Sequence, residues 1–237
     1  MKKELPHEGH RERLKNRFLT SSLDNFEPHN ILELLLFYSI PRQDTNEIAH
    51  ALLDRFGSLK GVFDADFSEL IKIKGIKENS ATLIKLIPQI SRAYMFEEIN
   101  KEKIFDHIDK VGSYFVNKYI GETNEVVYIM LLDNQFQLLK VVKLHEGSVN
   151  SSYITPRKIM DEVVKANAAT VILAHNHPNG LLVPSSEDCD TTNMLSCSLK
   201  MFDVTLLEHI LVAGDRFLPL AHELSLVQHF DSQRLKY

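Results

Sequence analysis

The stretch Val171-Ile-Leu-Ala-His-Asn-His-Pro-Asn-Gly-Leu-Leu-Val-Pro-Ser-Ser-Glu-Asp188 decides how this chain folds around its candidate site. Its first four residues are apolar and uncharged, which predicts a buried β-strand. Pro178 cannot continue a strand ladder, so the strand is expected to end at the histidines. Because side chains on a strand repeat every two residues, His175 and His177 should leave the strand end on the same side.

A helix start follows the two histidines. The segment Pro184-Ser-Ser-Glu-Asp188 is typical of a helix N-terminus, with Ser185 or Ser186 as the N-cap. Asp188 then falls in the first turn and is expected to point back at the histidines. Two imidazoles and one carboxylate, with a fourth position open, are the ligands of a catalytic zinc site. Taken singly, loop histidines are usually solvated, and Ser-x-x-Asp usually only caps its helix.

In this order and spacing the residues form His-x-His-(x)7-Ser-x-x-Asp. That string resembles the metal motif of the JAMM (MPN/JAB) metalloprotease-like domain. The longer form, His-Asn-His-Pro-x-Gly followed by Pro-Ser-x-x-Asp, is similar to the RadC branch of that superfamily. The resemblance implies that His175, His177 and Asp188 hold one Zn2+ ion per chain. The mixed nitrogen and oxygen donors are the one reason in the sequence to choose zinc over manganese.

The composition is that of an ordinary soluble protein, with 44% hydrophobic and 25% charged residues among 237. No apolar run approaches the roughly 20 residues of a membrane span, and the polar start predicts no secretory signal. Cys189 and Cys197 are expected on one helix, roughly 12 Å apart and too far for a disulfide. We therefore expect a reduced, cytoplasmic protein. With a net charge of −5, nucleic-acid binding would need a local basic patch.

Residues 1–102 are predicted to form a small all-helical domain. The expected helices are Gly9 to Phe18, His29 to Tyr38, Asn46 to Phe56, Phe67 to Ile71 and Glu78 to Phe96. Gly57 should close the third of them. The first helix is basic, and a solvated face is favoured over a phosphate contact once Glu8 and Glu12 are counted.

The turn Ile73-Lys-Gly-Ile-Lys-Glu-Asn-Ser-Ala81 resembles a helix-hairpin-helix, which holds a nucleic-acid backbone through main-chain N–H groups. The family pattern has a second glycine where this chain has Lys77. The lysine removes the close approach of the backbone but adds a positive charge. The resemblance implies DNA contact at Gly75 and Lys77; the alternative is a helical hairpin that only packs on the catalytic domain.

Residues 103–237 are predicted to form an α/β domain around a mixed sheet, because strands and helices alternate. The expected strands are Val126–Leu132, Phe136–Leu144, a short one from Gly147, Val171–Ala174 and Thr205–Val212; the expected helices are Lys110–Tyr119, one that begins at Thr155-Pro156, and Ser185–Leu199. This layout resembles the RadC-like proteins over nearly the whole chain. It implies the MPN/JAMM (cytidine-deaminase-like) fold. The departures from the family pattern, at Lys158, Glu208 and near Pro219, touch none of the expected ligands.

The resemblance also assigns catalytic roles. In the superfamily a glutamate just ahead of a core strand is the general base, and Glu125 best matches that place. Glu125 also fits an ordinary surface residue at a strand entry, and Glu122 and Glu146 are alternative bases. Ser185 is expected to donate to the oxyanion that develops as water adds to an amide carbonyl. His209 either orients a ligand or is a satisfied core histidine.

Three functions remain open on the sequence. The first is a zinc-dependent hydrolase of a peptide or isopeptide bond, acting on an unknown peptide or protein. The second is a DNA-associated repair or recombination accessory protein that uses the MPN-like domain as a scaffold. The third is an assembly module stabilised by its metal. The sequence indicates neither the substrate nor the oligomeric state.

Overall fold

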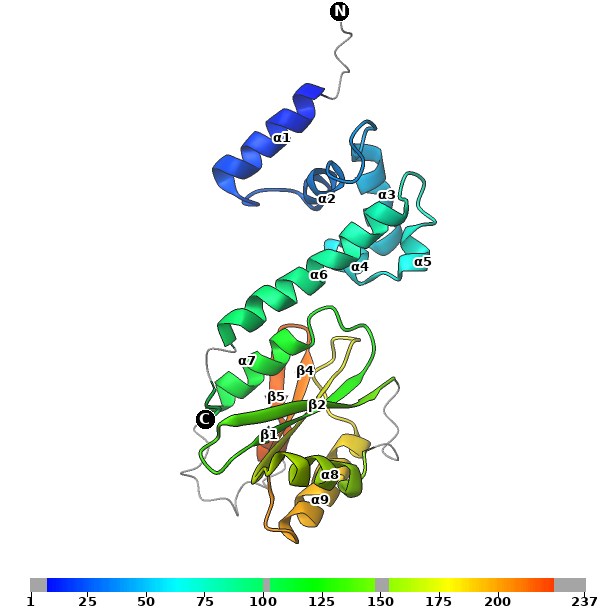
Figure 1. The fold of residues 1–237 in the computed structure, drawn as a ribbon. Coiled ribbons are helices and arrows are strands. Elements are labelled where there is room, and N and C mark those ends of the chain that lie inside the picture. Colours follow the sequence, from blue (N-terminus) through cyan, green and yellow to red (C-terminus); the bar gives the residue numbers. More distant parts are fainter. Residues whose placement is uncertain (1–7, 100–102, 148–153, 224–237) are drawn as a thin grey trace, which may run out of the picture. The chain divides into compact units, whose positions relative to one another are not determined.

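The computed structural model describes residues 8–99, 103–147 and 154–223 (Figure 1). The chain divides into two compact units, residues 1–90 and 91–237. This division falls inside helix α6 (Glu78–Ile99), and the domain boundary expected at residue 102 stays a prediction. Among the described residues, none of the helices has the length and apolar character that crossing a bilayer requires.

The first unit is helical, as the spacing of its apolar residues predicts. Its elements are α1 (Glu8–Ser21), α2 (Pro28–Leu36), α3 (Asn46–Phe56), α4 (Leu59–Asp64), α5 (Phe67–Leu70) and the start of α6. Gly57 ends α3 with a φ of 80°, as expected. Helix α4 was not predicted from the sequence, because it is short and contains Gly61, a poor helix former. The side chain of Ser58 accepts the Gly61 N–H at 3.0 Å and so caps its start.

The basic helix α1 uses two of its arginines for packing inside this unit. The Arg11 guanidinium donates to the carbonyls of Ile40 at 2.7 Å and Pro41 at 3.0 Å and lies over the Phe37 ring. Arg17 donates to a carbonyl of the following loop and lies over Phe26. The basic face of α1 is largely exposed, as expected for Arg13 and Arg17, and Arg11 also helps to hold the helix against the rest of the unit.

The second unit is built around one mixed five-stranded sheet. Its strands are β1 (Val126–Leu132), β2 (Leu138–Glu146), β3 (Thr170–Asn176), β4 (Thr205–Ala213) and β5 (Arg216–Pro219), in the order β2-β1-β3-β4-β5. Only β3 and β4 pair in parallel, and helix α9 (Ser186–Lys200) connects them, as a parallel pair requires. The mixed α/β fold is as predicted, whereas the short strand β5 was not foreseen. The strand expected after Gly147 lies outside the described residues.

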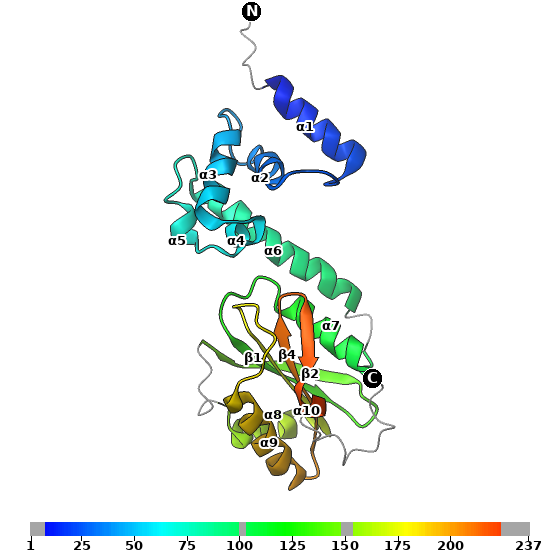
Figure 2. The same ribbon diagram turned by 180° about the vertical axis from the view of Figure 1, so that it is seen from behind.

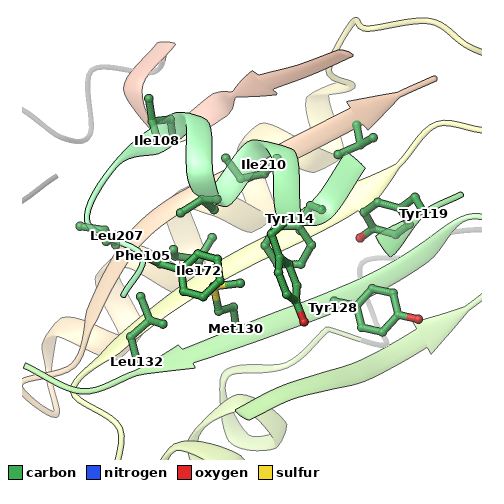
Figure 3. Packing of buried hydrophobic residues seen from close by; sticks show 14 of the residues in the cluster. Phe105, Ile108, Tyr114, Tyr119, Tyr128, Met130, Leu132, Ile172, Leu207 and Ile210 are labelled. Carbon is green, nitrogen blue, oxygen red and sulfur yellow. The ribbon is translucent and has the colours of Figure 1, made fainter. Parts of the chain in front are cut away.

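Helices cover both faces of this sheet (Figures 1 and 2). Helix α7 (Ile108–Lys118) lies on one face, and α8 (Pro156–Ala166) lies with α9 on the other. Alternate residues of β1 serve the two sides, so Met130 joins the α7 core and Ile129 the α8/α9 core. Figure 3 shows the α7 side, where Tyr114 packs beside the strand residues.

The ends of the central strands create the setting for the site. β3 pairs with β1 as far as Val127 and His175, and with β4 as far as Val212 and Asn176. All residues of β3 are buried, and the strand runs two residues further than the expected Val171–Ala174. The C-terminal end of β3 lies beside the start of α9, as the contact between His175 and Asp188 shows.

Candidate metal centre

The structure brings the three expected ligands together. His175 lies near the end of β3, His177 follows that strand, and Asp188 lies in the first turn of α9. The Nε2 atom of His175 lies 3.2 Å from Nε2 of His177 and 3.2 Å from Oδ1 of Asp188. The distance from His177 Nε2 to Asp188 Oδ2 is 3.7 Å. Both imidazoles and the carboxylate thus converge on one point, as strand geometry predicts.

These separations fit a single small cation. Atoms bound about 2.0–2.2 Å from a tetrahedral zinc ion lie about 3.3–3.6 Å from one another. The three residues each offer one ligand atom, and these atoms all lie within 4.8 Å of one another. His175 and Asp188 are buried, whereas His177 is partly exposed. The group can therefore hold a divalent metal ion with one side open to the solvent.

A capping box fixes the carboxylate of Asp188. The backbone N–H and the hydroxyl of Ser185 donate to Asp188 Oδ2 at 2.8 Å and 2.7 Å, and the Asp188 N–H donates to Ser185 Oγ at 3.1 Å. Burial would raise the pKa of Asp188, but its contacts with His175 and Ser185 outweigh burial and lower the pKa below its usual value. The residue is therefore held in the charged form that a metal ligand needs.

Behind the ligands, a chain of hydrogen bonds runs from His175 back to Asp188. His175 Nδ1 lies 2.8 Å from His209 Nε2, and His209 Nδ1 lies 2.6 Å from Thr192 Oγ1. The Thr192 hydroxyl donates to the carbonyl of Asp188 at 2.6 Å. One assignment of protons satisfies every step: His175 Nδ1 donates to His209, and His209 Nδ1 donates to Thr192. It leaves the Nε2 lone pair of His175 directed at the metal position.

His209 is suited to accept this hydrogen bond from His175 because its ring is held neutral. Burial removes water from its ring, and the neighbouring His175 adds to the effect, so the pKa of His209 lies well below its usual value. The side chain is 2% exposed. Of the two roles considered for His209 in the sequence, its contact with His175 supports the one that orients a ligand.

A small cleft opens over these ligands. It is lined by Glu125, His175, His177, Asn179, Ser185, Glu187 and Asp188. Glu125 directly precedes β1, as the sequence analysis expected of the general base. The two alternative glutamates are engaged elsewhere, since Glu122 pairs with Arg92 at 2.7 Å and Glu146 pairs with Lys143. Of the three candidates, Glu125 is the one that lines the cleft.

Other contributors could not be read from the motif. Asn179 and Glu187 line the cleft, and Thr192 supports the ligands. In the sequence, the one sign of these roles is that the three residues lie close to the motif residues. Asn176 stands between the two histidines, where its amide bonds to the backbone on both sides of Glu125. In the sequence, the one sign that Asn176 belongs to the site is its position between the two motif histidines.

The expected nucleic-acid residues lie in the first unit. Gly75 has a φ of 97°, and a β-carbon there would meet the Ile48 side chain at 2.6 Å. Local packing and backbone geometry are therefore sufficient reasons for a glycine at this position. Lys77 is exposed one residue before α6. DNA contact through Gly75 and Lys77 stays a prediction.

A mixed sheet with a His-His-Asp group at a strand tip and a helix start is the arrangement of a JAB-type domain. The model of the RadC-like JAB domain family matches residues 105–225, and the chain belongs to this family. It is 35% identical over 227 residues to a UPF0758 protein of Fusobacterium nucleatum subsp. nucleatum, covering 93% of this chain and 98% of that relative. It is also 30% identical over 204 residues to a UPF0758 protein of Pseudoalteromonas atlantica, covering 86% and 91%.

Proposed function

We propose that this protein is a zinc-dependent hydrolase of peptide or isopeptide bonds. The observation that carries the proposal is the convergence of three ligand atoms in an open cleft that Glu125 also lines. Two imidazoles, one carboxylate and a free position are the composition of catalytic rather than structural zinc sites. Membership of the RadC-like JAB domain family supports the same chemistry.

The residues of the chain divide the work of hydrolysis. His175, His177 and Asp188 hold the ion, which when bound acidifies a water molecule and polarises the substrate carbonyl. Glu125 takes a proton from the attacking water and passes it to the leaving amine. Ser185 stabilises the developing oxyanion with its hydroxyl. Because that hydroxyl donates to Asp188 in this structure, Ser185 must exchange partners when the substrate binds.

The direct test compares metal content and turnover in purified full-length protein. We expect one zinc ion per chain and cleavage of members of a peptide and isopeptide library. The change Glu125→Gln keeps the size of the side chain but removes its basicity, so it should lower kcat about 10²–10⁴-fold with the zinc retained. The change His175→Ala should remove both zinc and turnover.

A matched control is Glu122→Gln, which alters a glutamate of the same segment that pairs with Arg92. It should leave both zinc and turnover near the wild-type values. Zinc binding without cleavage of any library member would contradict the hydrolase. Equal losses in Glu122→Gln and Glu125→Gln would contradict the role of Glu125.

A second candidate, DNA association through the first unit, is favoured by one observation. Lys74 and Lys77 are both exposed around the left-handed turn at Gly75, which leads into the N-terminus of α6. The first unit carries as many acidic as basic residues, so such contact would involve few phosphates. A salt-dependent gel shift of the full chain should then weaken in Lys77→Ala. No shift at low salt would discard this candidate.

A further inference from the structure

We propose that Asn176 is the positioning residue for Glu125; this inference rests on the proposed hydrolase and adds a residue to it. Asn176 lies between two metal ligands and is 4% exposed. Its Oδ1 accepts the Val126 N–H at 2.7 Å, and its Nδ2 donates to the Asn124 carbonyl at 3.0 Å. One side-chain amide therefore joins the residues immediately before and after Glu125.

The Asn176 side chain bonds to the β1 segment just beyond the point where main-chain pairing of β1 and β3 stops. The main chains of β1 and β3 pair as far as Val127 and His175. Beyond that point β3 stays with β4, and the His177 N–H donates to the Val212 carbonyl at 2.8 Å. The Val126 N–H is buried and needs an acceptor. The Asn176 amide supplies it and extends the contact between the strands by one step.

The orientation of this amide is fixed by its partners. A backbone N–H can only donate and a carbonyl can only accept, so Oδ1 must face Val126 and Nδ2 must face Asn124. On the side toward β2, the carbonyl of Glu125 accepts the Gly147 N–H at 2.9 Å. The backbone of Glu125 is therefore tied on both sides, at the edge of the cleft that this residue lines.

This arrangement separates two tasks of neighbouring residues. His175 and His177 bind the ion, and the segment that carries them is held to β4 by main-chain bonds. Asn176 instead holds the general base in place relative to that ion. Loss of its amide should therefore release Glu125 while the metal ligands stay together.

The test uses Asn176→Ala in the full chain, with amide hydrogen exchange and zinc affinity as readouts that need no substrate. We expect the Val126 amide to exchange at least tenfold faster, while zinc affinity, measured by chelator competition, changes less than threefold. With a cleavable peptide, kcat should fall at least tenfold with KM unchanged. Combining Asn176→Ala with Glu125→Gln should add no further loss, because both act through one carboxylate.

Asn117→Ala is the matched control, since Asn117 is another buried asparagine whose amide donates to a backbone carbonyl, that of Ser113 in α7. It should change none of these readouts. If Asn176→Ala does not fold, Asn176→Ser replaces it under the same criteria, because serine is polar but too short to span both contacts. Unchanged exchange at Val126, or a loss of zinc affinity like that of His175→Ala, would overturn the inference even if the protein hydrolyses no peptide. Unchanged kcat in an active enzyme would overturn it too.

Discussion

Among single residues, His209 makes the most direct contact with a candidate metal ligand without being one itself. Its Nε2 lies 2.8 Å from His175 Nδ1, so it selects the tautomer of His175 that keeps Nε2 available. We expect His209→Leu to weaken zinc binding about 10–100-fold, because groups that orient a metal ligand have effects of this size. Chelator competition at neutral pH measures the change.

Ile210→Val provides the comparison for that experiment. Ile210 is fully buried in the next position of β4, and shortening it should lower stability by about 0.5–1.5 kcal/mol. Zinc affinity should stay at the wild-type value in this variant. A similar loss of affinity in both variants would mean that His209 acts only through general packing.

The residues of the site differ in how far the sequence reveals them. The convergence of His175, His177 and Asp188 was predictable, because strand alternation and a helix cap explain it within one short stretch of the sequence. Thr192 and Asn176 were not, because their roles depend on contacts with β4 and β1 across the fold. A spacing pattern carries no information about such neighbours.

At the scale of elements, the start of α9 combines a structural and a chemical task. Ser185 caps the helix and donates its hydroxyl to the ligand Asp188. We expect Ser185→Ala to lower the free energy of unfolding by about 1 kcal/mol, as the loss of an N-cap does. It should also weaken zinc binding, since Asp188 loses a donor. Thermal melting and zinc titration measure the two effects separately.

The matched variant is Thr155→Ala, which removes the N-cap of α8. It should reduce stability by a similar amount and leave zinc affinity unchanged, because the Thr155 side chain caps α8 by accepting the Lys158 N–H. If Ser185→Ala also leaves zinc affinity unchanged, the hydrogen bond from its hydroxyl to Asp188 does not contribute to metal binding.

Elements with strong periodicity were predicted well, whereas the short elements α4 and β5 were missed. Helix α3 and strand β1 have the expected bounds, because each has a clear apolar pattern between turn residues. Cys189 and Cys197 both lie in α9, the helix on which they were expected. The four-residue strand β5 was missed because it forms by pairing with β4, and its own sequence, Arg216-Phe-Leu-Pro219, is too short to show alternation.

For the molecule as a whole, we expect the buried Tyr114 of α7 to make the free energy of unfolding depend on pH in the alkaline range. Burial, with a smaller effect of Tyr128, raises the pKa of Tyr114 to about 12, whereas an unfolded tyrosine titrates near 10. Below pH 10 Tyr114 keeps its proton in both the folded and the unfolded chain, and its contribution to stability is fully present. Between pH 10 and 12 the unfolded state binds fewer protons, so stability falls as the pH rises.

Tyr114→Phe should therefore flatten this alkaline decline. Its unfolding free energy should drop less between pH 10 and 12 than that of the wild type, by up to about 1.4 kcal/mol per pH unit. Urea unfolding followed by circular dichroism across this range measures the slopes. Tyr94→Phe, at a tyrosine of α6 that is 68% exposed, should keep the wild-type slope. Equal slopes in all three proteins would show that Tyr114 ionises as readily in the folded chain as in the unfolded one, and that the packing under α7 does not exclude water from its hydroxyl.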